Sequence, residues 1–194
     1  MEQPARTRHR KRRPAKPVLE QKQSAPKVKQ LPNNYAFIDS QNLNLAIRDL
    51  KWKIDWKKLR VLLKDKFQIG KALLFIGYVP GNEKLYTYLQ EAGYIVVFRP
   101  TLEKNGIVKG NCDAELVLHA MIEYEHYQKA IIVSGDGDFH CLIEYLAEHG
   151  KLLKIGVPNR KKFSSLLRKY AEYFLFLQDH RKKIEYKEKE KAKK

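Results

Sequence analysis

Apolar residues in the middle of the chain alternate between short continuous runs and longer stretches with helical spacing. Five short runs, rich in Ile, Val and Phe, predict buried strands at residues 35–38, 72–78, 94–98, 130–133 and 152–157. The stretches between them predict helices at residues 43–50, 55–66, 82–92, 113–127 and 139–149. A last apolar run at residues 173–177 fits either an edge strand or the end of a final helix.

This order of elements predicts an α/β fold. Short links between alternating strands and helices favour right-handed crossovers and a mostly parallel sheet of about five or six strands, with helices on both faces. We therefore expect a Rossmann-like, three-layer sandwich. In such folds ligands bind beyond the carboxyl ends of the strands, so the residues that follow each strand are the first candidates for function.

Both ends of the chain differ from this middle part in composition. Residues 1–33 hold five of the eight prolines, and residues 1–30 carry ten Lys or Arg against two Glu. Residues 178–194 carry eight basic residues against four acidic ones. Segments with so little apolar surface cannot offset the loss of chain entropy. We predict a disordered basic tail at residues 1–33, one domain at residues 34–177 and a charged C-terminal tail at residues 178–194.

The formal net charge of +17 favours a polyanionic partner. The two ends contribute +8 and +4, which leaves +5 for the middle, so most of the excess charge lies on the tails. Each Lys or Arg that neutralises a phosphate releases counterions, which makes nucleic acid the first candidate. Composition leaves one alternative open, in which basic tails only keep the protein soluble or contact acidic membranes.

The sequence also bears on the compartment. No stretch of the chain is apolar and long enough for a secretory signal or a membrane-spanning helix. Two cysteines, Cys112 and Cys141, are too few for a disulfide framework and fit a reducing compartment. We therefore expect a cytoplasmic protein with no membrane partner. The sequence leaves open whether the chain forms a homodimer.

Four aspartates stand where the predicted fold would bring them together. Asp39 directly follows the first strand, and Asp136 and Asp138 directly follow the fourth. Asp113 opens the helix that leads into the fourth strand. Carboxylates this close repel one another unless a cation or protons neutralise them, and hard oxygen ligands suit Mg²⁺ or Mn²⁺. Helix capping is the alternative for each aspartate alone, but it does not explain two acids that flank Gly137, where one can cap.

Other site types fail on spacing. An EF-hand loop that starts at Asp136 needs Gly at its sixth position and Glu at its twelfth, where Cys141 and Ala147 stand. The sequence contains no Gly-rich dinucleotide or NTP motif and no nucleophile elbow. The candidate zinc ligands are Cys112, Cys141, His119 and His140. They lack the spacing of a zinc site, and buried thiols with an ordinary helix histidine are the simpler interpretation.

Taken in order, four segments resemble the NYN domain, a PIN-like nuclease family that includes the LabA-like proteins. They are the opening Phe37-Ile38-Asp39-Ser40-Gln41-Asn42, the central Lys109-Gly110-Asn111-Cys112-Asp113, the strand and turn Ile131-Ile132-Val133-Ser134-Gly135-Asp136-Gly137-Asp138-Phe139, and the segment around Ser164-Ser165-Leu166. The resemblance spans about residues 34–177. It implies a parallel α/β sandwich and metal-dependent cleavage of RNA.

The segments also indicate the roles of single residues. The four catalytic ligands of Mg²⁺ or Mn²⁺ are then Asp39, Asp113, Asp136 and Asp138. We expect Asp39, Asp136 and one of the other two to bind the metal directly. Asn42 and Ser134 match motif positions beside these acids, and they either orient water or phosphate or serve only as a turn residue and a strand-end residue.

One position departs from the family pattern. Many members carry a second acid six residues beyond the aspartate of the central segment, where this chain has His119. Either the metal shell is lighter by one carboxylate or the activity is weak or lost, and we do not count Glu115 as a replacement. Histidine is itself a competent ligand for Mn²⁺, so we count His119 as a supporting residue of the site. The rival function is therefore an NYN-fold module that binds RNA or a protein without cleavage. An aspartyl phosphatase is disfavoured because Gln41 stands where its second aspartate belongs.

Cations near the same edge would hold single-stranded RNA through its phosphates without reading its sequence. The candidates are Lys109, Arg160, Lys161 and Lys162. Tyr78 and Arg99, at the ends of the second and third strands, would stack on splayed bases. For each of these residues a solvated charge or core packing is the alternative.

Overall fold

The computed structural model describes residues 33–99, 102–104, 107–109 and 113–188, with the backbone alone for residues 102–104 and 107–109. Its strands are β1 Asn34–Asp39, β2 Ile69–Gly77, β3 Ile95–Arg99, β4 Leu102–Lys104, β5 Ile107–Lys109, β6 Ala130–Val133, β7 Leu152–Val157 and β8 Phe174–Phe176. Its helices are α1 Ser40–Asp49, α2 Trp56–Phe67, α3 Glu83–Glu91, α4 Asp113–Ile122, α5 His140–Glu148 and α6 Arg181–Ile184. Short 3-10 helices are η1 Gly137–Phe139, η2 Ser165–Tyr173 and η3 Leu177–His180.

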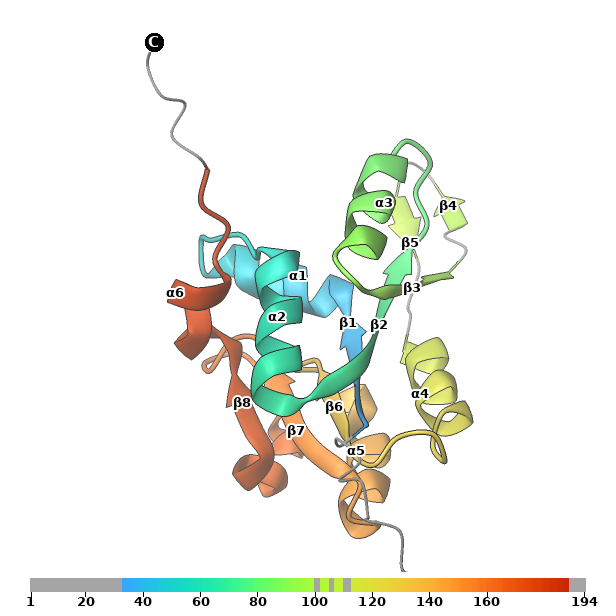
Figure 1. Cartoon of the computed structure of the whole chain (residues 1–194), viewed down its shortest axis with the longest axis vertical. Helices are drawn as coiled ribbons and strands as arrows, with labels where there is room; N and C mark the ends of the chain where they lie inside the picture. Colours follow the sequence, from blue (N-terminus) through green and yellow to red (C-terminus); the bar gives the residue numbers. More distant parts are fainter. Residues whose placement is uncertain (1–32, 100–101, 105–106, 110–112, 189–194) are drawn as a thin grey trace, which may run out of the picture. The chain divides into compact units, whose positions relative to one another are not determined.

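The strands of the central sheet all run parallel, in the order β3-β2-β1-β6-β7-β8 (Figure 1). The chain begins in the middle with β1, moves outward to β3 and then returns to β6 on the other side of β1. The connections that leave β1 and β6 therefore diverge, which creates a switch point of the kind at which α/β sheets bind ligands. The predicted Rossmann-like sandwich is confirmed, and the apolar run at residues 173–177 forms the edge strand β8.

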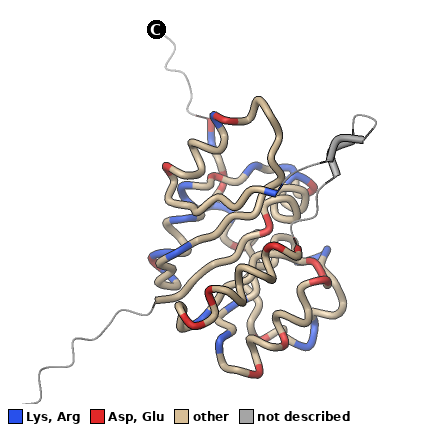
Figure 2. Tube along the Cα trace, turned by 90° about the vertical axis from the view of Figure 1, so that its right-hand side faces the viewer, with Lys and Arg blue, Asp and Glu red and all other residues tan. Residues whose placement is uncertain are grey.

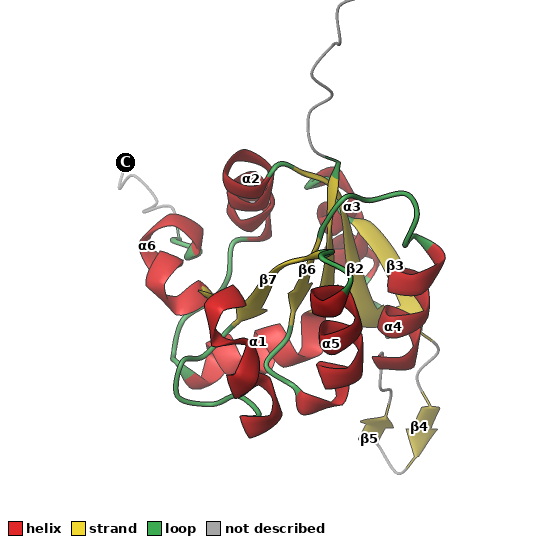
Figure 3. Cartoon of the chain, turned by 90° about the horizontal axis from the view of Figure 1, so that it is seen from below, coloured by secondary structure: helices red, strands yellow, loops and turns green. Residues whose placement is uncertain are grey.

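Helices cover both faces of this sheet. In β1 the side chains of Tyr35 and Phe37 enter one core and those of Ala36 and Ile38 the other, and all four are at most 2% exposed. The first core contains apolar residues of α4, α5 and η2, and the second contains those of α1, α2, α3 and α6. Figure 3 shows the strands between α2 on one side and α4 and α5 on the other. Because both faces are buried, the strands are continuous apolar runs that the sequence reveals.

Helix α4 ends at Ile122 rather than at the predicted Tyr127, because residues 123–126 form turns. The ring of Tyr127 packs against Phe37 with ring centroids 5.6 Å apart, and its hydroxyl donates to the carbonyl of Ala120 at 3.0 Å. This ring is 3% exposed. The chain leaves the helix early so that Tyr127 can enter the core beneath β1.

An antiparallel hairpin of β4 and β5 follows β3, where the sequence analysis expects a loop. Leu102 pairs with Lys109 across it. The residues between the two strands in the sequence are Asn105-Gly106, the pair that two-residue hairpin turns favour, so a signal was present. The flanking runs are too short to show the alternation that identifies a strand.

The fold continues beyond residue 177, where the sequence analysis expects a charged tail. Helices η3 and α6 follow β8, Ile184 is fully buried, and Ile54 forms an antiparallel bridge with Glu185. The predicted C-terminal tail is therefore corrected for residues 178–185, where one apolar side chain anchors a basic segment. Residues 1–32 of the predicted N-terminal tail lie outside the described residues. Among the described helices, none is both long enough and apolar enough to span a membrane.

Candidate functional site

Three connections meet at the carboxyl edge of the sheet, at the switch point between β1 and β6. The first leaves β1 at Asp39 and enters α1, and the second leaves β6 at Ser134 and enters η1. The third enters α4 at Asp113, and α4 contacts both β1 and η1. All four predicted aspartates therefore stand on elements that surround one edge of the sheet.

Three of these aspartates converge. Asp113, Asp136 and Asp138 each place one carboxylate oxygen within 4.8 Å of the other two. Asp113 is half-buried and Asp138 is exposed, so the cluster opens to solvent. Like charges at this spacing repel, and a hard divalent cation would remove the repulsion. The converging atoms are all carboxylate oxygens, the donors that Mg²⁺ and Mn²⁺ prefer, so the residues present fit such a cation.

Asp39 lies deeper than the other three acids. It is 7% exposed, its Oδ1 accepts the N–H of Asn42 at 3.0 Å and its Oδ2 accepts the hydroxyl of Ser134 at 3.4 Å. Burial raises the pKa of Asp39 and the charge of Asp113 acts in the same direction, while the hydrogen bonds from Asn42 and Ser134 lower it. Asp39 thus caps α1 and is also electrostatically coupled to the cluster through Asp113.

Two polar residues join the acid-bearing connections. The Ser134 hydroxyl accepts the N–H of Asp136 at 3.1 Å while it donates to Asp39. The side-chain oxygen of Asn42 accepts the N–H of Gly135 at 3.0 Å. Both residues lie beside the acids, where the sequence analysis expects them. These hydrogen bonds join the connection after β1, which carries Asp39, to the connection after β6, which carries Asp136.

The turn from Asp136 to Asp138 is held by a residue that the sequence analysis did not assign to the site. Asp136 caps η1 by accepting the N–H of Asp138 at 3.1 Å. Ser164, before η2, donates its N–H to the carbonyl of Gly135 at 2.9 Å. A Cβ atom at Gly137 would lie 2.3 Å from Ser164 Oγ, so this close approach requires glycine. The signal for Ser164 was its place in the fourth segment of the family resemblance.

His119 does not join the carboxylate cluster. Its half-buried ring packs against Phe75, with ring centroids 5.6 Å apart. Phe75 is the register partner of Asp39, so His119 lies near the acidic edge but against an aromatic surface. Glu115 forms an ion pair with Arg99, with an N–O distance of 3.4 Å. Within the described residues, Glu115 is not among the acids whose oxygens converge.

Two of the predicted phosphate-binding cations already have partners. Arg160 pairs with Asp179 and covers the ring of Phe176, with its guanidinium carbon 4.0 Å from the ring centroid. Lys162 pairs with Asp49 at 2.9 Å. Both basic side chains remain more than half exposed, at 53% and 69%. Exposed ion pairs of this kind contribute little stability, so an arriving phosphate can replace the carboxylate.

The other two cations differ in what the structure describes. Lys161 is exposed and forms no ion pair with any described residue. The backbone of Lys109 ends β5, and its side chain lies outside the described residues. Figure 2 shows Lys and Arg interspersed with Asp and Glu along the fold.

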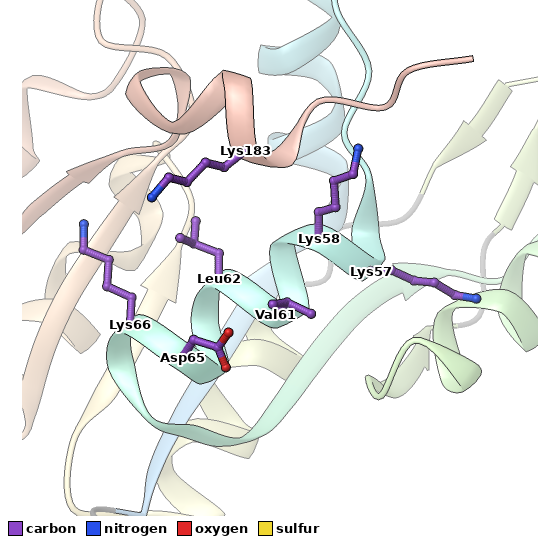
Figure 4. A pocket seen from close by; sticks show the side chains of 7 residues that line it. All are labelled: Lys57, Lys58, Val61, Leu62, Asp65, Lys66 and Lys183. Atoms are coloured by element: carbon purple, nitrogen blue, oxygen red, sulfur yellow. The ribbon is translucent and has the colours of Figure 1, made fainter. Parts of the chain in front are cut away.

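A separate pocket of about 500 Å³ lies along α2 and α6. Figure 4 shows its lining, which consists of Lys57, Lys58, Val61, Leu62, Asp65, Lys66 and Lys183. Neither the four aspartates nor their hydrogen-bond partners line this pocket. It offers positive charge and an apolar floor but no cluster of acids, so it is not the candidate active site.

Within the described part of the chain, Cys141 does not belong to a group of side chains that could hold a metal. Cys141 is a free, exposed thiol rather than the buried one that the sequence analysis expects, and Cys112 lies outside the described residues. Within the described ranges, the three aspartates are the one group of His, Cys, Asp and Glu whose ligand atoms converge. The chemistry of the edge is therefore that of carboxylates.

Comparison with known proteins assigns the chain to a family. The family model of the NYN domain matches residues 35–178, which is most of the chain. This chain belongs to the NYN domain family. A protein of unknown function from Vibrio parahaemolyticus has a similar fold, with a TM-score of 0.66 and 21% sequence identity over 80% of this chain and 98% of that chain. No curated protein matches the sequence.

Family membership gives the acidic edge a chemical context. NYN domains are PIN-like and generally nucleases, so they act on nucleic acids, and PIN-like nucleases typically use divalent metals. In this NYN domain the convergent carboxylates lie at the switch point, where parallel α/β sheets bind their ligands.

Proposed function

We propose that this NYN domain is a divalent-metal-dependent ribonuclease that hydrolyses phosphodiester bonds of single-stranded RNA. The convergence of Asp113, Asp136 and Asp138 within 4.8 Å at the switch point is the observation that carries the proposal. Capping of η1 explains the position of Asp136. It does not explain why two further carboxylates approach it, whereas a shared cation does.

The acids and the residues beside them would have different roles in the proposed reaction. Asp113, Asp136 and Asp138 would hold Mg²⁺ or Mn²⁺, and Asp39 adds negative potential behind them through its closeness to Asp113. Ser134 ties the turn after β6 to the end of β1, so the acids keep their spacing without the cation. The bound cation would supply positive charge to the scissile phosphate and make water easier to deprotonate.

Cations beyond β7 would hold the RNA backbone. Lys161 is exposed, and the ion pairs of Arg160 and Lys162 are exposed enough for phosphates to compete with the carboxylates. Lys109, at the end of the hairpin that leads to Asp113, is the fourth candidate. Such contacts fix the strand near the acids but carry no sequence information.

One observation favours a second function. His119, at the position where many NYN domains carry an acid, packs against Phe75 instead of joining the carboxylates. A cluster with one carboxylate fewer binds a cation more weakly, which favours a module that binds RNA without cleavage. The two functions share the fold and the charge, and they differ in turnover.

The test is incubation of the full chain with a fluorescent single-stranded RNA in Mn²⁺, in Mg²⁺ or in EDTA. The nuclease proposal expects RNA fragments with at least one metal and none with EDTA, and slower cleavage of a duplex of the same sequence. RNA binding in EDTA without fragments in either metal identifies the binding module instead.

A further inference from the structure

A pocket of about 360 Å³ is lined by residues of α1, of the carboxyl end of β2 and of the start of α3. One wall begins at Ser40, the residue that follows Asp39, and continues along α1. The other wall comes from the start of α3. None of the residues that line the pocket carries a charge. A neutral hollow therefore adjoins the acidic edge.

Three of the residues that line this pocket carry a side-chain amide, namely Gln41, Asn44 and Asn82. All three residues are exposed, and their amides form no hydrogen bond with any described residue. Asn82 stands at the cap position of α3, yet its side chain makes no capping hydrogen bond. Each amide carries both donors and an acceptor, so together they can read a polar edge of a neutral ligand.

Two leucines of the lining are exposed to solvent, and a flat ligand in the pocket would bury them. Leu45 is 44% exposed on the α1 side, and Leu85 is 40% exposed on the α3 side. Tyr86 also lines the pocket, and its side chain is fixed, since its hydroxyl accepts the N–H of Val79 at 2.8 Å and its ring packs on Phe98 with centroids 4.8 Å apart. The pocket thus combines a fixed, largely buried tyrosine with two leucines that gain burial when it is filled.

We propose that this pocket binds one nucleobase of the RNA, next to the phosphate on which the acidic edge acts. A phosphate or carboxylate ligand is disfavoured because the lining offers no positive charge. A nucleobase is flat, neutral and carries donors and acceptors on its edges, which side-chain amides read, while its face packs against apolar and aromatic side chains. The inference rests on the proposed function, since it takes nucleic acid as the ligand. It predicts that the domain selects the base beside the cleavage site.

The experiment measures binding without cleavage. Fluorescent RNA hexamers of adenylate, cytidylate and uridylate are titrated with the full chain in EDTA at one salt concentration. The variants are Asn44→Leu/Asn82→Leu, which keeps the bulk but removes two amides, and Asn82→Ala alone. Gln90→Leu is the matched control, because Gln90 is an exposed amide of α3 that does not line the pocket.

Wild type and Gln90→Leu should show about a tenfold spread of affinity among the three hexamers, the discrimination expected of one amide pairing with a base. The double variant should bind all three within about twofold, and Asn82→Ala should reduce the spread partially. Equal binding of the hexamers by wild type, or an unchanged spread in the double variant, overturns the inference. If wild type prefers one of the hexamers but does not cleave RNA in Mn²⁺, the nuclease proposal is overturned, while the assignment of the pocket to a nucleobase stands.

Discussion

At the scale of single residues, Asp39 serves two roles with opposite effects on stability. As a cap it accepts the N–H of Asn42 and stabilises α1. As a buried charge beside Asp113 it destabilises the fold, and its raised pKa reflects that cost. A substitution that keeps the acceptor and removes the charge separates the two roles.

We predict that Asp39→Asn raises the melting temperature in EDTA and lowers cleavage. The asparagine oxygen can still cap α1, while the buried negative charge is gone. Asp39→Ala removes the cap as well, so its free energy of unfolding should be lower than that of Asp39→Asn by roughly 0.5–2 kcal/mol. Thermal unfolding of both variants in EDTA checks this, and a lower melting temperature for Asp39→Asn than for wild type contradicts the account.

His119→Asp should give no tighter binding of Mn²⁺ and should lower stability. The new carboxylate would sit against Phe75 at a half-buried position rather than in the cluster. Calorimetric titration of Mn²⁺ into wild type and variant, with thermal unfolding of both, measures the two effects. Tighter Mn²⁺ binding together with faster cleavage would mean that His119 reaches the metal and that its contact with Phe75 is secondary.

The sequence could predict that the aspartates lie at one edge of the sheet but not how they are arranged there. Asp39, Asp136 and Asp138 follow strand ends, which can be located from apolar runs, and parallel strands end at one edge. The depth of Asp39 and the contact of Ser164 with the turn depend on how distant segments pack. Apolar periodicity contains no information about such contacts, so they appear only in the structure.

At the scale of elements, the turn after β6 and the start of η2 are locked together at Gly137. We predict that Gly137→Ala costs about 1–3 kcal/mol of unfolding free energy, because its Cβ would lie 2.3 Å from Ser164 Oγ. Cleavage should fall as well, because the shift moves Asp136 and Asp138. In a double-mutant cycle, Ser164→Ala should restore part of the loss by removing Oγ. Additive effects of the two substitutions would show that the contact is not the cause.

The length and the burial of an element determined whether the sequence could predict it. The strands β1 and β6 are buried on both faces, so the sequence shows them as continuous apolar runs. The hairpin of β4 and β5 has three residues per strand, too few for alternation to show. The 3-10 helices lack the 3.6-residue period that reveals an amphipathic helix.

At the scale of the whole molecule, charge is concentrated at the ends of the chain. The fold class was predictable because short apolar runs that alternate with amphipathic stretches allow few topologies. The observed sheet, in which the chain begins at the central strand β1, is one of these topologies. Composition does not reveal that α6 packs onto the fold, because its one buried apolar residue, Ile184, follows three basic residues, Arg181, Lys182 and Lys183. Composition alone therefore placed the end of the fold too early.

Deleting residues 1–30 should weaken RNA binding and flatten its salt dependence while the domain stays folded. These residues carry ten Lys or Arg against two Glu, and their phosphate contacts are nonspecific. Each lost contact with single-stranded RNA should reduce the slope of log affinity against log salt by roughly 0.7. Fluorescence titrations at several salt concentrations measure this slope. An unchanged slope would show that residues 1–30 do not contact the RNA phosphates.

The most direct test of the account is single-turnover cleavage of single-stranded RNA in Mn²⁺ by wild type, Asp136→Asn and the control Asp65→Asn, an exposed aspartate on α2. Asp136→Asn keeps an oxygen that can accept the N–H of Asp138 but loses a carboxylate of the cluster. It should cleave at least about 100-fold more slowly, while RNA affinity in EDTA and thermal stability stay at wild-type values or rise. Asp65→Asn should cleave at the wild-type rate. Equal rates for Asp136→Asn and wild type would contradict a metal-dependent nuclease at this edge.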